Sequence, residues 1–139
     1  MSSILEQEIY SQPDVIAHLL EREAQHIQQI VEQLPPFEYV LIAARGSSDH
    51  AATYAKYAWA ALAGYPVALA TPSLQTLYKT SPRMTGAFIV GISQSGQSPD
   101  IIAVLAEEIL VTGGGIHGIA EVGGAGADVE LVAAAEVPA

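Results

Sequence analysis

The sequence predicts an α/β fold, a three-layer αβα sandwich with a parallel sheet, preceded by an N-terminal helical arm. Short apolar runs alternate with helical patterns along the chain, which is typical of right-handed βαβ units and parallel strands. Half of the 139 residues are hydrophobic but only 6% are aromatic, a composition typical of strands buried on both faces. Because no repeat or linker divides the remainder, we expect an arm over residues 1–36 and one domain over residues 37–139.

The first predicted element is a helix over residues 3–34. Pro35 and Pro36 end it. The dipeptide Gln12-Pro13 predicts a break inside it, with Pro13 at a helix start and Ser11 or Gln12 as the cap. A helix buries its apolar stripe against a partner, so we expect this arm to pack on the sheet or on a second subunit. The stripe consists of residues at 3.6-residue spacing, namely Ile16, Leu19, Leu20, Ile27, Ile30, Val31 and Leu34.

The rest of the chain alternates between the two kinds of element. Apolar runs predict four strands, at residues 39–44, 66–70, 87–92 and 116–122. Between them the pattern predicts helices at residues 49–63, 73–80 and 99–110. Gly64 is well placed as the residue that ends the first of these helices.

The tail fits the alternation less well. Only six residues, the glycine-rich stretch 123–128, separate the fourth strand from an apolar segment at 129–134. A parallel crossover needs a dozen or more residues. The segment is therefore an edge strand of unusual connection or a helix, or the domain is shortened at its C-terminal end, and we favour the shortened domain.

Two serine-rich turns follow the first and third predicted strands. In a sheet of order 2-1-3-4 these strands are neighbours, and ligands bind beyond their carboxyl ends at this switch point. Free backbone N–H groups and the helix dipole stabilise an anion there. Serine hydroxyls and the Gln94 amide can donate further hydrogen bonds, and Gly46 and Gly96 let the backbone approach closely. The turns predict a phosphate site that includes Ser48, Ser93, Gln94, Ser95 and Ser98.

Several residues near these turns have two interpretations. Serine also favours helix N-caps without binding anything, but two such turns on neighbouring strands favour binding. Ser47 could contact a sugar hydroxyl or carbonyl. Arg45 either lends charge to the site or is a surface residue. His50 is either a proton-transfer group or, as we favour, a residue that faces solvent.

Charge and composition exclude several classes of partner. The formal net charge is −10 with only five basic residues, so the chain lacks the basic surface that nucleic acid or anionic lipid requires. No apolar run reaches the roughly 18 to 20 residues that cross a membrane. The absence of cysteine and the scattered histidines predict no metal site. We expect a cytoplasmic protein, because there is no disulfide framework and no signal-peptide pattern.

Three stretches resemble the sugar isomerase (SIS) domain. They are residues 8–13 (Glu-Ile-Tyr-Ser-Gln-Pro), 45–51 (Arg-Gly-Ser-Ser-Asp-His-Ala) and 93–98 (Ser-Gln-Ser-Gly-Gln-Ser). The likeness is to the isomerase part of amino-sugar phosphate aminotransferases and to stand-alone deaminase relatives without a glutaminase domain. It implies a flavodoxin-like fold that binds a hexose phosphate without a cofactor. It places Ser48, Ser93, Gln94, Ser95 and Ser98 on the phosphate and Ser47 on the sugar.

The sequence also departs from this family's pattern. Arg45 stands where a cysteine is common, and Gln97 and Ser98 replace a glutamate and a threonine. Enzymes of this group carry two such domains and here there is one, so we expect a homodimer whose interface completes the sugar site. Isomerisation needs a base, for which His50 and Glu136 are weak candidates. The functions left open are isomerase or deaminase chemistry and a non-catalytic module that senses sugar phosphate.

Two motifs suggest other activities. Residues 113–118 match the dinucleotide pattern G-x-G-x-x-G, but they follow a helix and open a strand, the reverse of the required context. Residues 91–95 nearly match the nucleophile elbow of serine hydrolases, which would use Ser93, His117 and Asp128. The extra hydroxyls of this turn and the family likeness favour anion binding over hydrolase activity.

Overall fold

The computed structural model describes residues 3–93, 96–112, 119–121 and 131–132. The chain divides into two compact units, Met1–Leu34 and Pro35–Ala139, which are described separately below. Within the described residues, no helix is both long and apolar enough to span a lipid bilayer.

The first unit is a single continuous helix, α1, from Ile4 to Gln33. Ser3 caps it through a reciprocal pair: the Glu6 amide donates to Ser3 Oγ at 3.2 Å, and the Ser3 amide donates to Glu6 Oε2 at 3.3 Å. This capping box starts the helix upstream of Pro13. The predicted break at Gln12-Pro13 is therefore wrong, because Pro13 lies inside the helix.

Ser11 does not act as a cap at this proline. Its hydroxyl donates to the carbonyl of Glu8 at 2.9 Å, inside the helix. Further along α1, Arg22 Nε donates to Glu23 Oε1 at 2.7 Å. This hydrogen bond lowers the pKa of the Glu23 carboxyl. No residue of α1 is buried.

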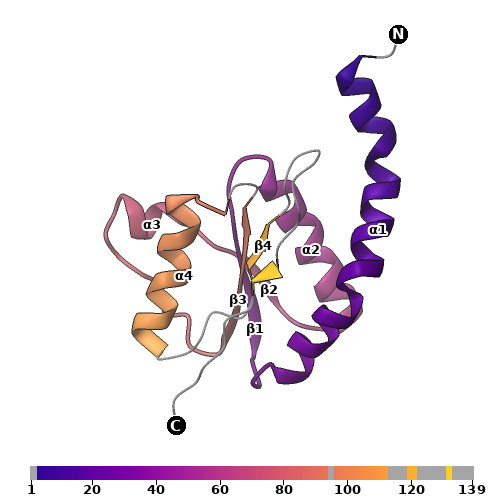
Figure 1. The fold of residues 1–139 in the computed structure, drawn as a ribbon. Coiled ribbons are helices and arrows are strands. Elements are labelled where there is room, and N and C mark those ends of the chain that lie inside the picture. The colour runs from indigo at the N-terminus through magenta and orange to yellow at the C-terminus, as the bar shows by residue number, and fades with distance from the viewer. Residues whose placement is uncertain (1–2, 94–95, 113–118, 122–130, 133–139) are drawn as a thin grey trace. The chain divides into compact units, whose positions relative to one another are not determined.

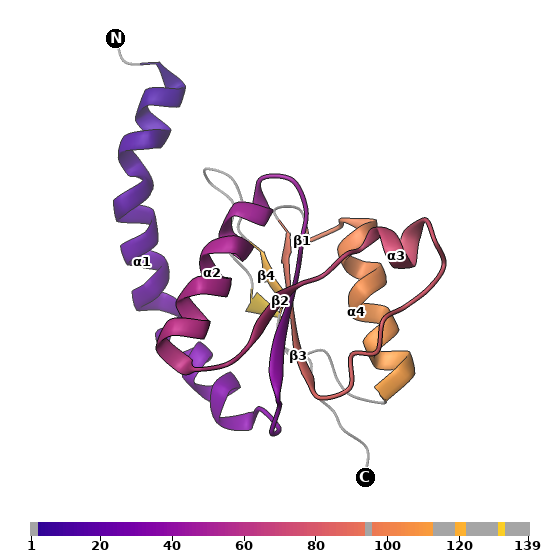
Figure 2. The same ribbon diagram turned by 180° about the vertical axis from the view of Figure 1, so that it is seen from behind.

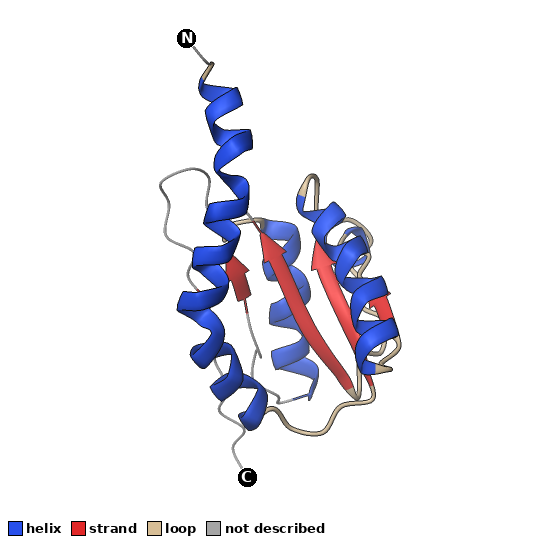
Figure 3. Cartoon of the chain, turned by 90° about the vertical axis from the view of Figure 1, so that its right-hand side faces the viewer, coloured by secondary structure: helices blue, strands red, loops and turns tan. Residues whose placement is uncertain are grey.

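The elements of the second unit are β1 Tyr39–Ala44, α2 Ser48–Ala63, β2 Val67–Leu69, α3 Ser73–Thr76, β3 Ala87–Ser93, α4 Pro99–Thr112, β4 Ile119–Glu121 and β5 Leu131–Val132. The strands form one five-stranded sheet of order β2-β1-β3-β4-β5. Helix α2 covers one face, and α3 and α4 cover the other (Figures 1 and 2). The long strands point the same way (Figure 3). These features confirm the predicted α/β fold and the strand order 2-1-3-4.

The last described strand, β5, bears on one of the alternatives left open for the tail. β5 pairs antiparallel with β4, and an antiparallel pair needs no crossover helix. Leu131 and Val132 thus form an edge strand, whereas a domain shortened at its C-terminal end stays a prediction. Helix α3 also differs from its prediction, since it ends at Thr76. Lys79 then adopts a positive φ of 52°, which is incompatible with a continuing right-handed helix.

The core forms two layers on either side of β1. Val40, Ile42 and Ala44 pack with Ala52 of α2, and the alternate residues Leu41 and Ala43 face α4. This alternation follows from the two-residue period of a strand. On the α4 side, a Cβ at Gly91 would lie 3.0 Å from both Ile101 Cγ2 and Leu105 Cδ1. Glycine at this position therefore lets α4 lie close against β3.

Candidate functional site

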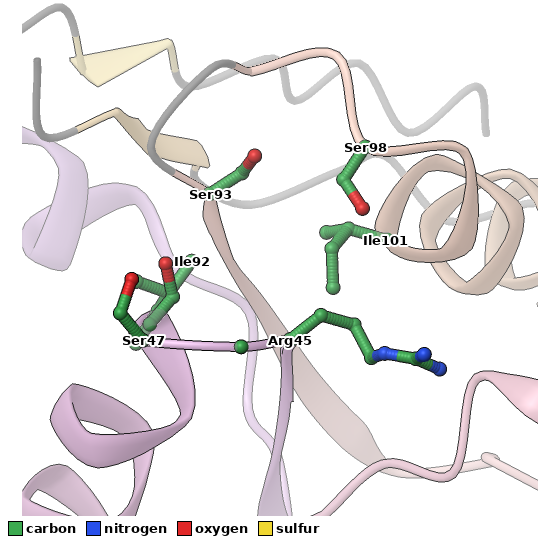
Figure 4. Close-up of a pocket in the computed structure, with 8 residues that line it drawn as sticks. Arg45, Ser47, Ile92, Ser93, Ser98 and Ile101 are labelled. Carbon is green, nitrogen blue, oxygen red and sulfur yellow. The ribbon is translucent and has the colours of Figure 1, made fainter.

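The two serine-rich turns lie next to each other at one edge of the sheet. β1 and β3 pair in parallel with Ala44 opposite Ile92, so the residues that follow these strands emerge side by side. Between them lies a cavity of about 230 Å³ (Figure 4). Its lining comes from both turns and from the start of α4, and it consists of Arg45, Gly46, Ser47, Ser48, Ile92, Ser93, Ser98 and Ile101.

The first turn leads from β1 into α2. Gly46 has a positive φ of 63°, a conformation that glycine adopts without steric cost. Ser47 is the N-cap of α2, yet its side chain makes no capping hydrogen bond. The Ser47 hydroxyl therefore does not cap the helix, and Ser47 lines the cavity together with Ser48.

The backbone of this turn is partly occupied and partly free. The Asp49 amide donates to the Gly46 carbonyl and the His50 amide to the Ser47 carbonyl, each at 3.2 Å. The amides of Ser47 and Ser48 donate to no backbone carbonyl of the described residues. The first N–H groups of a helix lack partners inside it. These two amides are thus the donors that α2 can offer to a ligand.

The second turn contributes a buried and a half-buried serine. Ser93 ends β3 and is a polar residue with only 7% of its surface exposed. Ser98 precedes α4, and its carbonyl accepts from the amides of Ile101 and Ile102 at 3.1 and 3.0 Å. The Ser98 and Ser93 side chains both reach toward the cavity (Figure 4). Gly96 has a positive φ of 64° between them.

The predicted phosphate ligands are only partly placed by the structure. Ser48, Ser93 and Ser98 line one cavity, and so does Ser47, the predicted sugar contact. Gln94 and Ser95 lie outside the described residues, as do the weak base candidate Glu136 and the hydrolase partners His117 and Asp128. The other base candidate, His50, is exposed and does not line the cavity.

Arg45 is the charged side chain in the cavity lining. Its Nη1 lies 3.1 Å from Oδ2 of Asp100, the second residue of α4. The ion pair connects the end of β1 to the start of the helix that follows β3. Sequence reasoning named Arg45 but not this partner, because nothing in the local pattern around Asp100 signals a contact with a residue that precedes it by 55 positions.

The chemistry offered by the lining is that of hydrogen-bond donation. Four hydroxyls, two free amides and one arginine can donate, whereas the lining residues include no carboxylate and no imidazole. Within the described residues, no group of histidine, aspartate and glutamate side chains could hold a metal ion. Ile92 and Ile101, which sequence reasoning missed, form the apolar part of the wall. Such a donor set suits an anionic group with several oxygen acceptors.

Comparison with curated proteins finds two significant relatives, whereas no protein-family model matches the chain. A glutamine–fructose-6-phosphate aminotransferase (isomerizing) of Photorhabdus laumondii is 34% identical over 109 residues, 73% of this chain. The enzyme of the same name from Bradyrhizobium diazoefficiens is 32% identical over 108 residues, 70% of this chain. The matched part spans only 18% and 17% of these relatives, so the chain corresponds to less than a fifth of their length.

Solved structures also share the fold, among them the following two. A structure named as a phosphosugar isomerase from Silicibacter pomeroyi superposes with a TM-score of 0.64 at 40% identity, over 71% of this chain and 31% of that chain. The C-terminal domain of glucosamine-fructose-6-phosphate aminotransferase from Francisella tularensis gives a TM-score of 0.63, over 78% of this chain and 31% of that chain. Its identity of 23% supports the fold alone.

Proposed function

Because the chain is a sugar isomerase (SIS) domain related to the isomerase part of glutamine–fructose-6-phosphate aminotransferases, we propose that its cavity binds the phosphate of a hexose phosphate. One observation carries the proposal: hydroxyls from two turns, far apart in sequence, converge on a single cavity beyond the ends of β1 and β3. We favour fructose-6-phosphate, which the names of the curated relatives contain, and glucosamine-6-phosphate, its amino-sugar counterpart.

In the proposed complex, the phosphate lies between α2 and α4. Ser48, Ser93 and Ser98 donate hydroxyl hydrogen bonds to its oxygens, and the free amides of Ser47 and Ser48 add main-chain donors. Gln94 and Ser95 belong to the same proposed set. Helix N-termini favour negative charge, which allows an acidic chain with net charge −10 to hold a dianion. The Ser47 hydroxyl, which caps nothing, contacts the sugar.

The described lining favours binding over catalysis. Proton transfer between sugar carbons requires a base within hydrogen-bond reach, and the lining residues supply none. A module that binds sugar phosphate without turnover is therefore the second candidate function. Isomerase or deaminase chemistry would need a base from elsewhere, and a second copy of the domain could provide one.

We also propose that the protein is a cytoplasmic homodimer, in which residues 1–36 form an arm and residues 37–139 a SIS domain. The cavity offers donors suited to the phosphate, while the described lining offers little to the hydroxyls of the sugar ring. A partner subunit would complete that half of the site. The apolar side chains exposed along α1 support an association surface, and they include Ile16, Leu20, Ile27 and Val31.

Calorimetric titration tests the binding proposal. Fructose-6-phosphate and glucosamine-6-phosphate should bind, whereas fructose and glucosamine, which lack the phosphate, should bind far more weakly. Equal affinity for the phosphorylated and free sugars would refute a phosphate anchor. Incubation with glucosamine-6-phosphate, or with fructose-6-phosphate and ammonium, separates the two functions. Product formation indicates an enzyme, and binding without product indicates a sensing module.

A further inference from the structure

The ion pair between Arg45 and Asp100 poses an electrostatic problem for the proposed site. Asp100 lies in the first turn of α4, where the helix dipole stabilises a carboxylate. The same helix N-terminus is where the proposed phosphate would lie, beside Ser98. A dianion and a carboxylate that occupy one helix end repel each other. The site therefore needs a nearby positive charge to offset Asp100.

Arg45 provides that charge. Its Nη1 lies 3.1 Å from Asp100 Oδ2, and its side chain also lines the cavity. In Figure 4 the Arg45 chain runs past Ile101, with its guanidinium directed away from Ser47 and Ser93. Asp100 itself does not line the cavity. The carboxylate thus holds the guanidinium at the rim, and the guanidinium neutralises the carboxylate.

The pair is poorly suited to a purely stabilising role. The Arg45 side chain is 54% exposed and the Asp100 side chain 29%. Exposed ion pairs contribute little to folding, because solvent screens them and the side chains lose entropy. Their electric field still acts on a charged ligand a few ångströms away, where the wall of the cavity excludes part of the water.

We infer that Arg45 is a charge-compensating and positioning residue, which neutralises Asp100 so that a phosphate dianion can bind at the start of α4. The inference rests on the proposed function. If it is correct, the affinity for phosphate depends on the net charge of residues 45 and 100. The local charge at positions 45 and 100 is neutral in the wild type, negative in Arg45→Ala, positive in Asp100→Asn and neutral again in the double variant.

Affinities should follow this order of charge. Glucosamine-6-phosphate, titrated at a pH of about 8 where a phosphate monoester is a dianion, should bind Arg45→Ala about tenfold more weakly than the wild type. Asp100→Asn should bind more tightly than the wild type, and the double variant should return close to wild-type affinity. Arg83→Ala is the matched control, because it removes one arginine from an exposed position outside the cavity and should leave binding unchanged.

Ligand charge provides the second arm of the experiment. Glucosamine 6-sulfate has a similar shape but a single negative charge, so the loss in Arg45→Ala should be clearly smaller for the sulfate than for the phosphate. Circular dichroism of each variant separates loss of affinity from loss of folding. Affinities are compared only among variants whose spectra match the wild type, because Asp100→Asn could also restore folding to an Arg45→Ala protein by removing the unpaired carboxylate.

The outcomes separate this inference from the proposed function. If Asp100→Asn weakens binding as much as Arg45→Ala does, the pair acts as a mechanical link between the turns and the inference is overturned. Equal losses for phosphate and sulfate would overturn it as well. If the wild type binds neither sugar phosphate nor inorganic phosphate, the proposed function fails and the inference fails with it.

Discussion

Ser48 and Ser98 line the cavity from two different turns, Ser48 at the start of α2 and Ser98 just before α4. Hydrogen bonds to a charged acceptor contribute about 1.5 to 3 kcal/mol each. We predict that Ser48→Ala and Ser98→Ala each weaken binding of glucosamine-6-phosphate by roughly ten- to hundredfold. Calorimetric titration measures the effect. Thr53→Ala, which removes an exposed hydroxyl from the same helix α2, is the control, and an equal loss in that variant would place the site elsewhere.

Ser47 makes a different prediction, because it stands at an N-cap position without acting as a cap. Removing a working serine cap costs typically about 1 kcal/mol. Ser47→Ala should therefore change the free energy of unfolding by less than about 0.5 kcal/mol, measured by urea denaturation. It should weaken binding of glucosamine-6-phosphate more than binding of inorganic phosphate, because its hydroxyl is assigned to the sugar. A full capping loss would show that the hydroxyl does bond the helix end.

The sequence allowed the grouping of some residues around the cavity to be predicted, but not every contact between them. Glycine and serine at the two strand-to-helix turns indicated that Ser47, Ser48, Ser93 and Ser98 belong together, and the structure brings them to one cavity. The partner of Arg45 could not be predicted, since it depends on the register of β1 against β3 and on where α4 begins. Register and helix start are tertiary properties that local patterns do not encode.

At the scale of single elements, Gly91 determines how close α4 lies to the sheet. Its missing side chain leaves room that a Cβ would fill at 3.0 Å from Ile101 and Leu105. Overpacking of this kind costs typically 1 to 3 kcal/mol, so Gly91→Ala should lower the free energy of unfolding by about that amount, measured by urea denaturation. Because Ile101 lines the cavity, we also expect weaker sugar-phosphate binding. Unchanged stability and affinity would mean that α4 shifts freely.

Helix α1 offers a test of the proline inside it. Pro13 has no N–H to donate to the carbonyl four residues earlier, a defect worth about 3 kcal/mol in a helix interior. Pro13→Ala restores this donor and should raise the helical signal in circular dichroism and delay its loss on heating. Ser3→Ala removes the capping box and should act in the opposite direction. A fall in helicity for Pro13→Ala would show that the helix needs its proline.

Most elements were predictable because their patterns are local. The apolar runs gave β1 its observed bounds, Tyr39–Ala44, and placed β3 to within one residue of its end, Ser93. The sequence pattern was misleading or inconclusive where the deciding contact lies elsewhere in the chain. The capping box at Ser3 extends α1 through Pro13, and β4 provides an antiparallel partner for β5. The helix propensity of proline does not reveal the capping box, and the length of a loop does not reveal the direction in which two strands pair.

At the scale of the whole molecule, the proposed homodimer is the point most open to a direct test. Light scattering at micromolar concentration should give twice the mass of one chain. Leu20→Glu places a charge among the exposed apolar side chains of α1, and it should weaken the dimer if this helix contributes to the interface. Glu21→Gln, which changes an exposed polar residue of the same helix, is the control and should leave the measured mass unchanged. A monomer for the wild-type chain would contradict the proposal.

The pairing of β1 with β3 has a consequence for how ligands could be found. The cavity is assembled from two segments that β2 and α3 separate in sequence, so it exists only in chains whose sheet has already formed. Ligand binding should then shift the folding equilibrium of the entire domain toward the folded state. A ligand at a hundred times its dissociation constant would add about 2.7 kcal/mol to stability. The melting temperature thus becomes a screening signal, by which a panel of phosphorylated sugars could be ranked without any assay of turnover.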